Sequence, residues 1–459
     1  MRITVLGAGP AGYAAALRAA QKGAKVTLIE KERLGGTCLN WGCIPTKVWV
    51  ESAHRWRAIQ EAADFGLECT AHRPNLQAIV ARKNQVVETL VGGIQQLMAK
   101  QKVHVLRGRG TVVNPRLVSV QLADGSREEV ENDCLILATG SVPASLPIPG
   151  LDLPGVMTSK EALDLKELPS SLVIIGGGVI GLEFANIFQT LGSKVTVVEL
   201  LPCVLPGVDV EIVRRLMPVL KKSGLDIKVS TKLLEIKKQD NMLALILEGS
   251  KGVETLTAEK VLVATGRIPS LSGVETKALG LELEGRFVKV NPYLETNLPG
   301  VYAIGDIVKS PMLAHVATAE AETAVENIFG KRQAMDYSAV PAAVYISPEV
   351  AYVGLTEEEA KEQGLTYKVG KFPFTANGRA LTLGEAQGVV KIIAGENGRI
   401  LGAHLLGPQA SELVAELTLA LRWGITTEQI SHTIHAHPSL AEAVLESAHS
   451  VFGKALHFS

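Results

Sequence analysis

Two segments of the chain repeat one pattern of apolar and polar positions. Residues 3–30 and 172–199 each begin with a short apolar run, turn at closely spaced glycines, continue with a helical period and end in a second apolar run closed by glutamate. A short apolar run bounded by glycine is typical of a buried strand, and a period near 3.6 residues is typical of a helix. Each segment is therefore predicted to be a strand–helix–strand unit of an α/β fold.

Between the two units, the pattern predicts a long helix and a domain boundary. A helical pattern covers residues 76–100, and an apolar strand covers 134–140. A proline-rich connection follows at Pro143, Pro147 and Pro149. Prolines at this density are typical of a loop, so one domain is expected to end here.

After the second unit, the chain is expected to return to the first domain and then to form a third. The phrase VLVATGRIP (261–269) parallels the earlier CLILATG, and a strand ending at 306 and a helix from about Leu313 follow. From Val340 onward, strands alternate with helical patterns at 411–422 and 440–452, which is typical of an α+β domain. The predicted domains are 1–147 completed by 271–338, then 148–270, and finally 339–459.

Composition and charge exclude several classes of function. The 459 residues carry 46 Lys+Arg and 47 Asp+Glu, so the net charge of −1 provides no basic field for nucleic acid or anionic lipid. No run approaches the roughly 18 uncharged apolar residues of a membrane span, and no signal peptide precedes the first strand. Five cysteines are an odd number in a long chain, which argues against a secreted disulfide framework. We expect a cytoplasmic protein in which any disulfide is catalytic.

The repeated glycine units predict two dinucleotide sites. In each unit the closing glutamate, Glu30 or Glu199, lies 23 residues after the first motif glycine. The first glycine permits a tight turn, the second lets backbone N–H groups approach a pyrophosphate, and the third lets the helix pack closely. The glutamates are expected to accept ribose hydroxyls, and the alternative is a glycine turn without a ligand. The motif glycines are Gly7, Gly9 and Gly12 in the first unit and Gly176, Gly178 and Gly181 in the second.

The segment GGTCLNWGCIPTK (35–47) carries the most specific chemistry. Cys38 and Cys43 have four residues between them, and Pro45 is expected to open a helix. Two thiols this close can form a disulfide, and a helix N-terminus favours a thiolate, which suits electron transfer. The rival interpretation is a metal site, but structural zinc needs a second pair of ligands. The other three cysteines, Cys69, Cys134 and Cys203, are expected to be packing residues.

These motifs resemble the pyridine nucleotide–disulfide oxidoreductases, and among them most closely the dihydrolipoamide dehydrogenases. The resemblance covers the whole chain and rests on the cysteine segment, both glycine units, and the phrases ATGS, ATGR, AIGD, MLAH and HAHPSLAE. It implies two Rossmann-like dinucleotide-binding domains and a C-terminal α+β dimerisation domain. It also implies FAD on the first unit and NAD on the second, with Cys43 against the flavin and Cys38 toward a dithiol substrate.

Further site residues follow from the resemblance. It places a Lys47–Glu183 ion pair beside the flavin ring, and it makes Asp306 a ligand of the flavin's ribityl chain. From the residues alone, Lys47 reads equally as a surface lysine, Glu183 as an acid in the first helical turn, and Asp306 as a helix cap. The expected FAD contacts are Gly7, Gly9, Gly12, Glu30, Lys47, Gly110, Thr139, Gly140, Ser141, Asp306, Met312, Leu313, Ala314 and His315. The expected NAD contacts are Gly176, Gly178, Gly181, Glu183, Glu199 and Gly266.

The C-terminal segment HTIHAHPSLAE (432–442) supplies a candidate base. His437 precedes Glu442 by five positions, and Pro438 is expected to open the helix that carries the carboxylate. By resemblance, His437 is the base for the substrate thiol, while His435 packs or binds backbone. The sequence departs from the commoner HAHPTLSE at Ser439 and Ala441, which leaves the role of His437 intact.

The expected activity is the NAD-linked oxidation of protein-bound dihydrolipoyl groups. Glu199 would repel a 2′-phosphate and no Lys or Arg follows before Arg214, which favours NAD over NADP. Glutathione- or mercuric-reductase-like activity, or a chiefly structural role in a multienzyme complex, are the alternatives. The resemblance further implies a homodimer, with lipoyl-bearing subunits of 2-oxoacid dehydrogenase complexes or the glycine cleavage carrier protein as partners.

Overall fold

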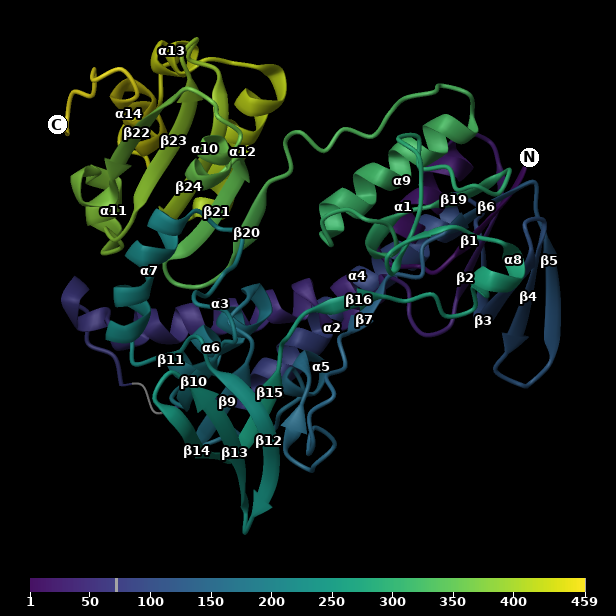
Figure 1. The fold of residues 1–459 in the computed structure, drawn as a ribbon, viewed down its shortest axis with the longest axis horizontal. Coiled ribbons are helices and arrows are strands. Elements are labelled where there is room, and N and C mark those ends of the chain that lie inside the picture. The colour runs from purple at the N-terminus through teal and green to yellow at the C-terminus, as the bar shows by residue number, and fades with distance from the viewer. Residues whose placement is uncertain (71–72, 459) are drawn as a thin grey trace. The chain divides into compact units, whose positions relative to one another are not determined.

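The computed structural model describes residues 1–70 and 73–458, and the chain divides into two compact units (Figure 1). The first unit contains residues Met1–Val48, Gln77–Leu146 and Gly266–Asp336. The second contains Trp49–Leu76, Pro147–Thr265 and Tyr337–Ser459. The α/β fold class predicted from the sequence is confirmed. The three-domain division stays a prediction.

The first unit is built on a seven-stranded sheet in the order β19-β6-β1-β2-β3-β4-β5. The strands from β19 to β3 pair in parallel, whereas β4 and β5 extend β3 as antiparallel hairpins. The strand bounds are β1 (Arg2–Leu6), β2 (Lys25–Glu30), β3 (His104–Asn114), β4 (Leu117–Leu122), β5 (Arg127–Glu131), β6 (Cys134–Leu137) and β19 (Val301–Ala303).

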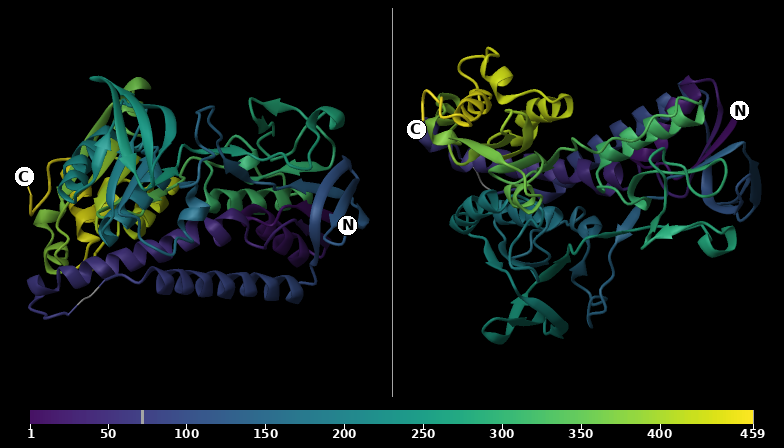
Figure 2. Two further views of the ribbon diagram at one scale, coloured as in Figure 1. Left: turned by 90° about the horizontal axis from the view of Figure 1, so that it is seen from below. Right: turned by 45° about the horizontal axis from the view of Figure 1, so that its top comes forward.

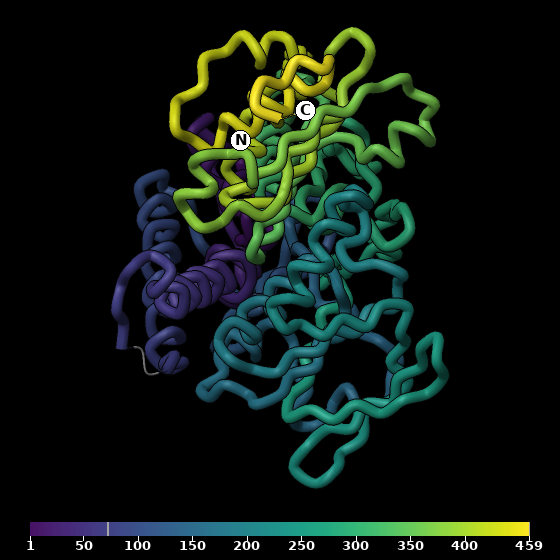
Figure 3. The backbone as a smooth tube through the Cα atoms, turned by 90° about the vertical axis from the view of Figure 1, so that its left-hand side faces the viewer, coloured from purple at the N-terminus to yellow at the C-terminus, as the bar shows by residue number. Residues whose placement is uncertain are grey.

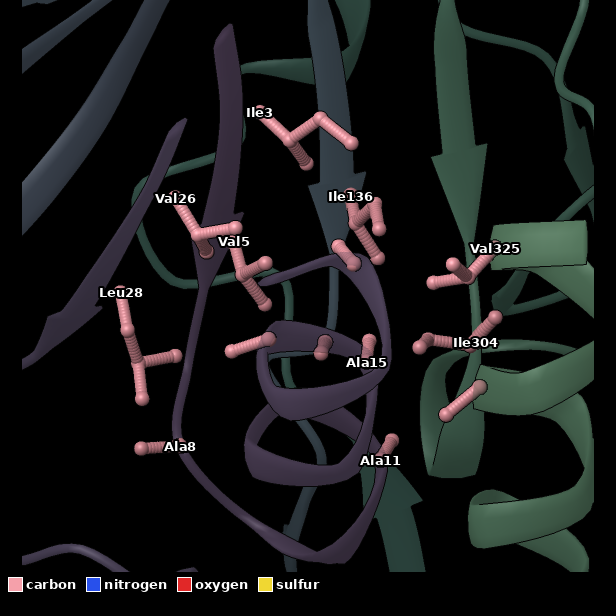
Figure 4. Packing of buried hydrophobic residues seen from close by; sticks show 14 of the residues in the cluster. Ile3, Val5, Ala8, Ala11, Ala15, Val26, Leu28, Ile136, Ile304 and Val325 are labelled. Atoms are coloured by element: carbon pink, nitrogen blue, oxygen red, sulfur yellow. The ribbon is translucent and has the colours of Figure 1, made fainter. Parts of the chain in front are cut away.

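Two helices pack on this sheet through small side chains. They are α1 (Pro10–Gln21) and α9 (Ala314–Ile328). A third and longer helix, α4 (Leu76–Lys100), is seen lengthwise in the left panel of Figure 2. Figure 4 shows Ala11 and Ala15 of α1 among Ile3, Ile136 and Val325, all of them at most 5% exposed. Alanines let the helix approach the strands closely, so the glycine turn at the end of β1 is held rigidly.

Shorter elements complete the first unit. The cysteine segment forms α2 (Gly36–Trp41) and the start of α3 (Cys43–Gln60). A two-stranded antiparallel ribbon pairs β7 (Ser141–Pro143) with β16 (Arg267–Pro269). The remaining elements are α8 (Thr276–Leu279), β17 (Leu283–Glu284), β18 (Phe287–Val288) and the 3-10 turn η2 (Gly305–Ile307).

The second unit contains a five-stranded parallel sheet in the order β11-β10-β9-β15-β8. The second glycine unit is β9 (Ser171–Ile175), α6 (Val179–Leu191) and β10 (Lys194–Val198) at its centre. An antiparallel sheet of β12 (Lys232–Gln239), β13 (Met242–Gly249) and β14 (Gly252–Ala258) packs its apolar side chains against those of β9 and β15. The other elements are η1 (Ala62–Phe65), β8 (Val156–Met157), α5 (Ser159–Ala162), α7 (Val210–Lys222), β11 (Asp226–Lys228) and β15 (Lys260–Val263).

The last quarter of the chain, green to yellow in Figure 3, forms an antiparallel sheet in the order β20-β21-β24-β23-β22. Its apolar core includes side chains from α12 and α14. The helices expected at 411–422 and 440–452 are α12 (Ala410–Trp423) and α14 (Glu442–Ser450). The remaining bounds are β20 (Ala342–Val344), β21 (Glu349–Gly354), α10 (Glu357–Glu362), β22 (Tyr367–Pro373), η3 (Phe374–Ala376), α11 (Gly378–Leu383), β23 (Val389–Gly395), β24 (Ile400–Gly407) and α13 (Thr427–Ser431).

No helix in the described part of the chain is long and apolar enough to cross a membrane.

Candidate active site

Two consecutive helices bring Cys38 and Cys43 together. Cys38 lies in α2 and Cys43 is the first residue of α3, with Gly42 between the helices. A Cβ at Gly42 would lie 2.8 Å from the carbonyl oxygen of Thr37, so only glycine fits this tight reversal. Pro45 is the third residue of α3, where its missing N–H costs no helical hydrogen bond.

The side chains of Cys38 and Cys43 are hydrogen-bonded to each other. The side-chain hydrogen bond with Cys43, together with burial, raises the pKa of Cys38 far above its ordinary value, and the nearby charge of Lys47 opposes that shift. Cys38 is therefore held as a thiol. A thiolate at Cys43 would lie at the positive end of the α3 dipole.

Of the other three cysteines, two do not pack. Cys69 and Cys203 are exposed, so the expectation that they are packing residues is wrong for both. Each lies in a segment without helix or strand. Cys134 is half-buried beside the core of the first unit, as expected.

The first glycine turn forms a cradle that admits no side chain at its first and third glycines. Gly7 has φ +99°, and a Cβ there would lie 2.4 Å from the carbonyl oxygen of Ala138. A Cβ at Gly12 would lie 1.8 Å from the oxygen of Gly7, which confirms that this glycine lets α1 pack against the turn. Gly9 caps α1 without a side-chain hydrogen bond, and a Cβ at Gly36 would lie 2.6 Å from its Cα. Free N–H groups at an uncapped helix start fit a phosphate.

The second glycine turn repeats this geometry. Gly176 has φ +110°, and a Cβ at Gly181 would lie 1.9 Å from the oxygen of Gly176. Gly178 caps α6, again without a side-chain hydrogen bond, and a Cβ there would meet nothing within 4 Å. The turn therefore offers open space directly in front of uncapped N–H groups, which fits a second pyrophosphate.

The two motif glutamates hold the glycine turns. Glu30 accepts the N–H of Ala8 at 2.8 Å, and Glu199 accepts the N–H of the corresponding Gly177 at 2.6 Å. Their second oxygens accept the N–H groups of Glu32 and Leu201. Burial raises the pKa of Glu30 despite these hydrogen bonds. Each carboxylate oxygen still has a lone pair, so ribose binding stays a prediction that these contacts permit.

Arg267 was not predicted as a site residue, yet it joins three parts of the first unit. Its Nε donates to Ser141 Oγ at 2.7 Å, and its Nη2 donates to the Ser141 carbonyl at 2.6 Å. The same Nη2 lies 3.5 Å from Thr37 Oγ1, next to Cys38. Ser141 Oγ in turn donates to Asp306. The phrases ATGS and ATGR thus meet beside the cysteine segment.

The charge of Arg267 is balanced locally. Burial lowers the pKa of its guanidinium, whereas the charges of Asp306 and Cys43 raise it. The sequence held one clue to the role of Arg267. The similar phrases ATGS and ATGR differ only in their last residue, which is Ser141 in the first and Arg267 in the second. A second unpredicted neighbour is Tyr13 of α1, whose pKa is raised by burial and then by the charge of Cys38.

The other predicted flavin contacts lie in the first unit, where the structure gives several of them packing roles. Gly110 lies in β3, and a Cβ there would be 2.5 Å from Leu6 Cδ1, so glycine is needed for packing. Thr139 Oγ1 donates to the Ser270 carbonyl at 2.5 Å, and Gly140 has φ +70°. Gly266, which the sequence assigned to NAD rather than to the flavin, also lies in the first unit, with φ +105° and nothing within 4 Å of an added Cβ. The backbone of Met312, Leu313, Ala314 and His315 leads into α9, whose N-cap Leu313 makes no side-chain hydrogen bond.

Glu183 is buried, at 3% exposure, as its apolar neighbours suggested. Gly178 caps α6 and Glu183 is its fifth residue, so the placement of Glu183 in the first helical turn is wrong. Its Oε1 accepts the N–H of Tyr345 at 3.0 Å. Lys47 belongs to the first unit and Glu183 to the second, and their ion pair stays a prediction.

His437 and Glu442 form the predicted pair. His437 Nδ1 lies 2.9 Å from Glu442 Oε1, and Ser439 N donates to the other oxygen at 2.9 Å. Burial raises the pKa of Glu442, but the bonds from Ser439 and His437 outweigh it and lower the pKa below its ordinary value. The imidazole is exposed, and because Nδ1 faces the carboxylate, Nε2 is the nitrogen that can take a proton from a substrate.

The local chain path differs from the prediction. Pro438 does not open the helix, because α14 begins at Glu442 and residues 438–441 form bends and a turn before it. Glu442 reaches back from the first helical position. His435 contacts the Thr433 carbonyl at 2.9 Å and Glu416 at 3.0 Å, which confirms that it binds backbone.

Among residues 1–70 and 73–458, no three His, Cys, Asp or Glu side chains are grouped as a metal site would require.

Comparisons with known proteins show the family of the chain. Residues 1–321 match the family model described as pyridine nucleotide-disulphide oxidoreductase, and residues 340–448 match its dimerisation domain. A mitochondrial dihydrolipoyl dehydrogenase of Arabidopsis thaliana is 41% identical, covering 99% of this chain and 91% of that protein. A leghemoglobin reductase of Glycine max is 42% identical, covering 98% and 88%.

The fold is also similar to those of solved structures along nearly the whole chain. LpdA from Mycobacterium tuberculosis has a TM-score of 0.91 and 28% identity, covering 98% of this chain and 99% of that one. The HOCl-induced flavoprotein disulfide reductase RclA from Escherichia coli has a TM-score of 0.87 and 28% identity, covering 98% and 99%.

Proposed function

The chain belongs to the pyridine nucleotide-disulphide oxidoreductase family, and from this membership we propose that it oxidises protein-bound dihydrolipoyl groups with NAD as electron acceptor. The observation that carries the proposal is the Cys38–Cys43 thiol pair, hydrogen-bonded at the junction of α2 and α3 and placed beside a glycine cradle. Two adjacent thiols are the group that can exchange with a dithiol substrate.

FAD fits the first unit. The turn of Gly7, Gly9 and Gly12 would hold its pyrophosphate, Glu30 a ribose, and Asp306 the ribityl chain. Lys47, Gly110, the turn from Thr139 to Ser141 and the backbone from Met312 to His315 complete the proposed contacts. Bound there, FAD would supply two-electron transfer between the cysteine pair and NAD.

NAD fits the second unit. The turn of Gly176, Gly178 and Gly181 would hold its pyrophosphate, with Glu183 as a further contact in the same unit. The contact expected at Gly266, which belongs to the first unit, stays a prediction. Glu199 is 8% exposed and already holds two N–H groups, so a 2′-phosphate would meet a fixed negative charge. This contact favours NAD over NADP and disfavours a glutathione-reductase-like activity.

The chain's own residues perform the thiol chemistry. His437, oriented by Glu442, accepts the proton of a dihydrolipoyl thiol at Nε2. The resulting thiolate attacks Cys38 of the oxidised pair, so a substrate–Cys38 bond forms, the Cys38–Cys43 bond breaks, and Cys43 leaves as a thiolate. The second substrate thiol then displaces Cys38. The lipoyl disulfide is released, and the cysteine pair has gained two electrons.

The dimerisation-domain match supports a homodimer, in which we place His437 of one subunit at the cysteine pair of the other. Lipoyl-bearing subunits of 2-oxoacid dehydrogenase complexes or the glycine cleavage carrier are the proposed partners. A cytoplasmic location is part of the proposal, although the Arabidopsis relative is named as mitochondrial. Cell fractionation decides this point.

The test is steady-state NAD reduction by dihydrolipoamide, measured beside NADP and beside a Cys43→Ser variant. NAD-specific turnover that the variant lacks supports the proposal. Turnover with NADP alone, or with glutathione disulfide or mercuric ion instead of the lipoyl dithiol, contradicts it. A colourless protein without flavin would point to a structural role.

A further inference from the structure

A buried lysine joins the C-terminal sheet to the start of α7, which follows the second glycine unit in the chain. Lys391 of β23 is 1% exposed, and its Nζ lies 2.9 and 2.8 Å from the two carboxylate oxygens of Asp209, which is 0% exposed. Nζ also lies 2.6 Å from Glu357 and 3.3 Å from Glu211. Lysine is almost never fully buried unless it is paired, and this one has three carboxylates.

The charges around this group are nearly balanced. Lys371 of β22 lies 2.6 Å from Glu211, and Arg215 of α7 lies 2.9 Å from the other oxygen of Glu211. The fully buried His404 of β24 is close by, and burial lowers its pKa, so it adds no positive charge at neutral pH. Burial alone would lower the pKa of Lys391, but its bonds to Asp209 and Glu357 raise it. Lys391 is therefore a permanent cation at the centre of the group.

Asp209 lies at one end of a loop whose other end, Glu199, accepts a hydrogen bond from Gly177 of the second glycine turn. The loop covers residues 200–208 and runs from Glu199 to Asp209, which caps α7 by accepting the N–H of Glu211. Near its start, Leu201 N donates to Glu199 at 2.7 Å. Leu205 N donates to the Gly177 carbonyl at 2.9 Å, so the loop is bound directly to the glycine turn.

The middle of the loop packs on the same turn. Val204 is 0% exposed, and a Cβ at Gly177 would lie 2.9 Å from its Cγ1. Leu205 is 2% exposed and adopts φ +50°, a left-handed conformation that a leucine keeps only when its surroundings impose it. The loop therefore depends on both of its ends, the glycine turn and the bond from Asp209 to Lys391.

We propose that Lys391 is a positioning residue for NAD, which acts through Asp209 to hold the 200–208 loop against the second glycine turn. In this way a residue of the C-terminal sheet sets the geometry of the dinucleotide site. Lys391 itself does not contact the dinucleotide. The inference rests on the proposed function, because it takes the second glycine turn to be the NAD site.

The test uses the intact flavin-loaded protein with Lys391→Met, which keeps the length of the side chain and removes its charge. Calorimetric titration with NADH gives Kd, and steady-state kinetics give KM for NAD and for dihydrolipoamide. We expect Kd for NADH and KM for NAD to rise about tenfold, with kcat at saturating NAD and KM for dihydrolipoamide within about twofold of wild type. A purely structural role would lower the yield of active protein without this selective shift.

Lys371→Met is the matched control, since Lys371 contacts Glu211 at the rim and not Asp209, and its side chain is 37% exposed. It should leave Kd for NADH within about twofold. If Lys391→Met does not fold, Glu357→Gln provides the test instead. The Glu357 side chain is 35% exposed, so the protein should tolerate glutamine there, and the loss of charge weakens the contact with Lys391. Here we expect about a threefold rise in Kd and faster amide hydrogen exchange in residues 200–208.

The outcomes separate the two proposals. If wild type binds NADH but the folded variants match it in Kd and hydrogen exchange, the positioning role is refuted and the proposed function is unaffected. If wild type itself binds no NADH, the proposed function fails, and this inference fails with it.

Discussion

The two glycines at the start of α6 provide a test that separates folding from ligand binding within one motif. Gly181 has no room for a side chain, because a Cβ there would lie 1.9 Å from the Gly176 carbonyl oxygen. Gly178 faces open space, and its φ of −76° suits any residue. Alanine at the first position should damage the fold, whereas alanine at the second should damage only what binds in front of the turn.

The expected magnitudes follow from these distances. In Gly181→Ala, α6 must move by more than 1 Å to open the 1.9 Å contact, which puts the cost at the top of the overpacking range, about 3 kcal/mol or more. In Gly178→Ala, the helix cap loses about 0.5–1 kcal/mol, because alanine is a poor N-cap. If the pyrophosphate lies against Gly178, the added methyl group should weaken NADH binding at least tenfold, about 1.4 kcal/mol.

The assay combines thermal unfolding with NADH titration of the flavin-loaded protein. Gly178→Ala should keep a Tm within a few degrees of wild type and lose NADH affinity. Gly181→Ala should unfold at a clearly lower temperature. Unchanged NADH affinity in Gly178→Ala would refute the assignment of this turn to the dinucleotide, and a wild-type Tm in Gly181→Ala would refute the packing argument.

Four further predictions concern the thiol chemistry and cofactor choice. His437→Gln should lower kcat with dihydrolipoamide by about 10²- to 10⁴-fold, the usual contribution of general base catalysis, and NADH-dependent reduction of a small quinone should be spared. Because the pKa of Glu442 is lowered, its carboxylate stays ionised as the pH falls from 7 to 5. Glu442→Gln should therefore lower kcat by the same factor at every pH in that range. A difference in kcat between wild type and variant that disappears toward pH 5 would contradict this. Arg267→Met should slow alkylation of the reduced protein at Cys43 by iodoacetamide near neutral pH, because it removes a cation that favours the thiolate, and Arg267→Lys should restore part of the rate. Glu199→Ser should narrow the preference for NAD over NADP and also weaken NAD binding, since Glu199 holds the glycine turn; an unchanged ratio of the two Kd values would count against the charge argument.

Features set by neighbours in the chain were predictable. The strands, the glycine turns and the helix at 76–100 follow from local periodicity and from the conformations that only glycine adopts. The contact between His437 and Glu442 was also predictable, because five positions place them within reach of each other. The residues at which helices begin were harder to predict from the sequence. Pro438 favoured an earlier start to α14, and the bond from Ser439 to Glu442 marks the later one that the chain adopts.

The sequence by itself determined the family-specific motifs, the two repeated units, and the paired cysteines, since each depends on residues a few positions apart. Only the tertiary structure placed Arg267 on Ser141, 126 positions away, and Lys391 on Asp209, 182 positions away. A lysine or arginine in a sequence looks like a surface residue, because nothing in its neighbours shows what will cover it. Whether the charge is buried, and which carboxylate must then balance it, is decided when distant strands and helices pack together.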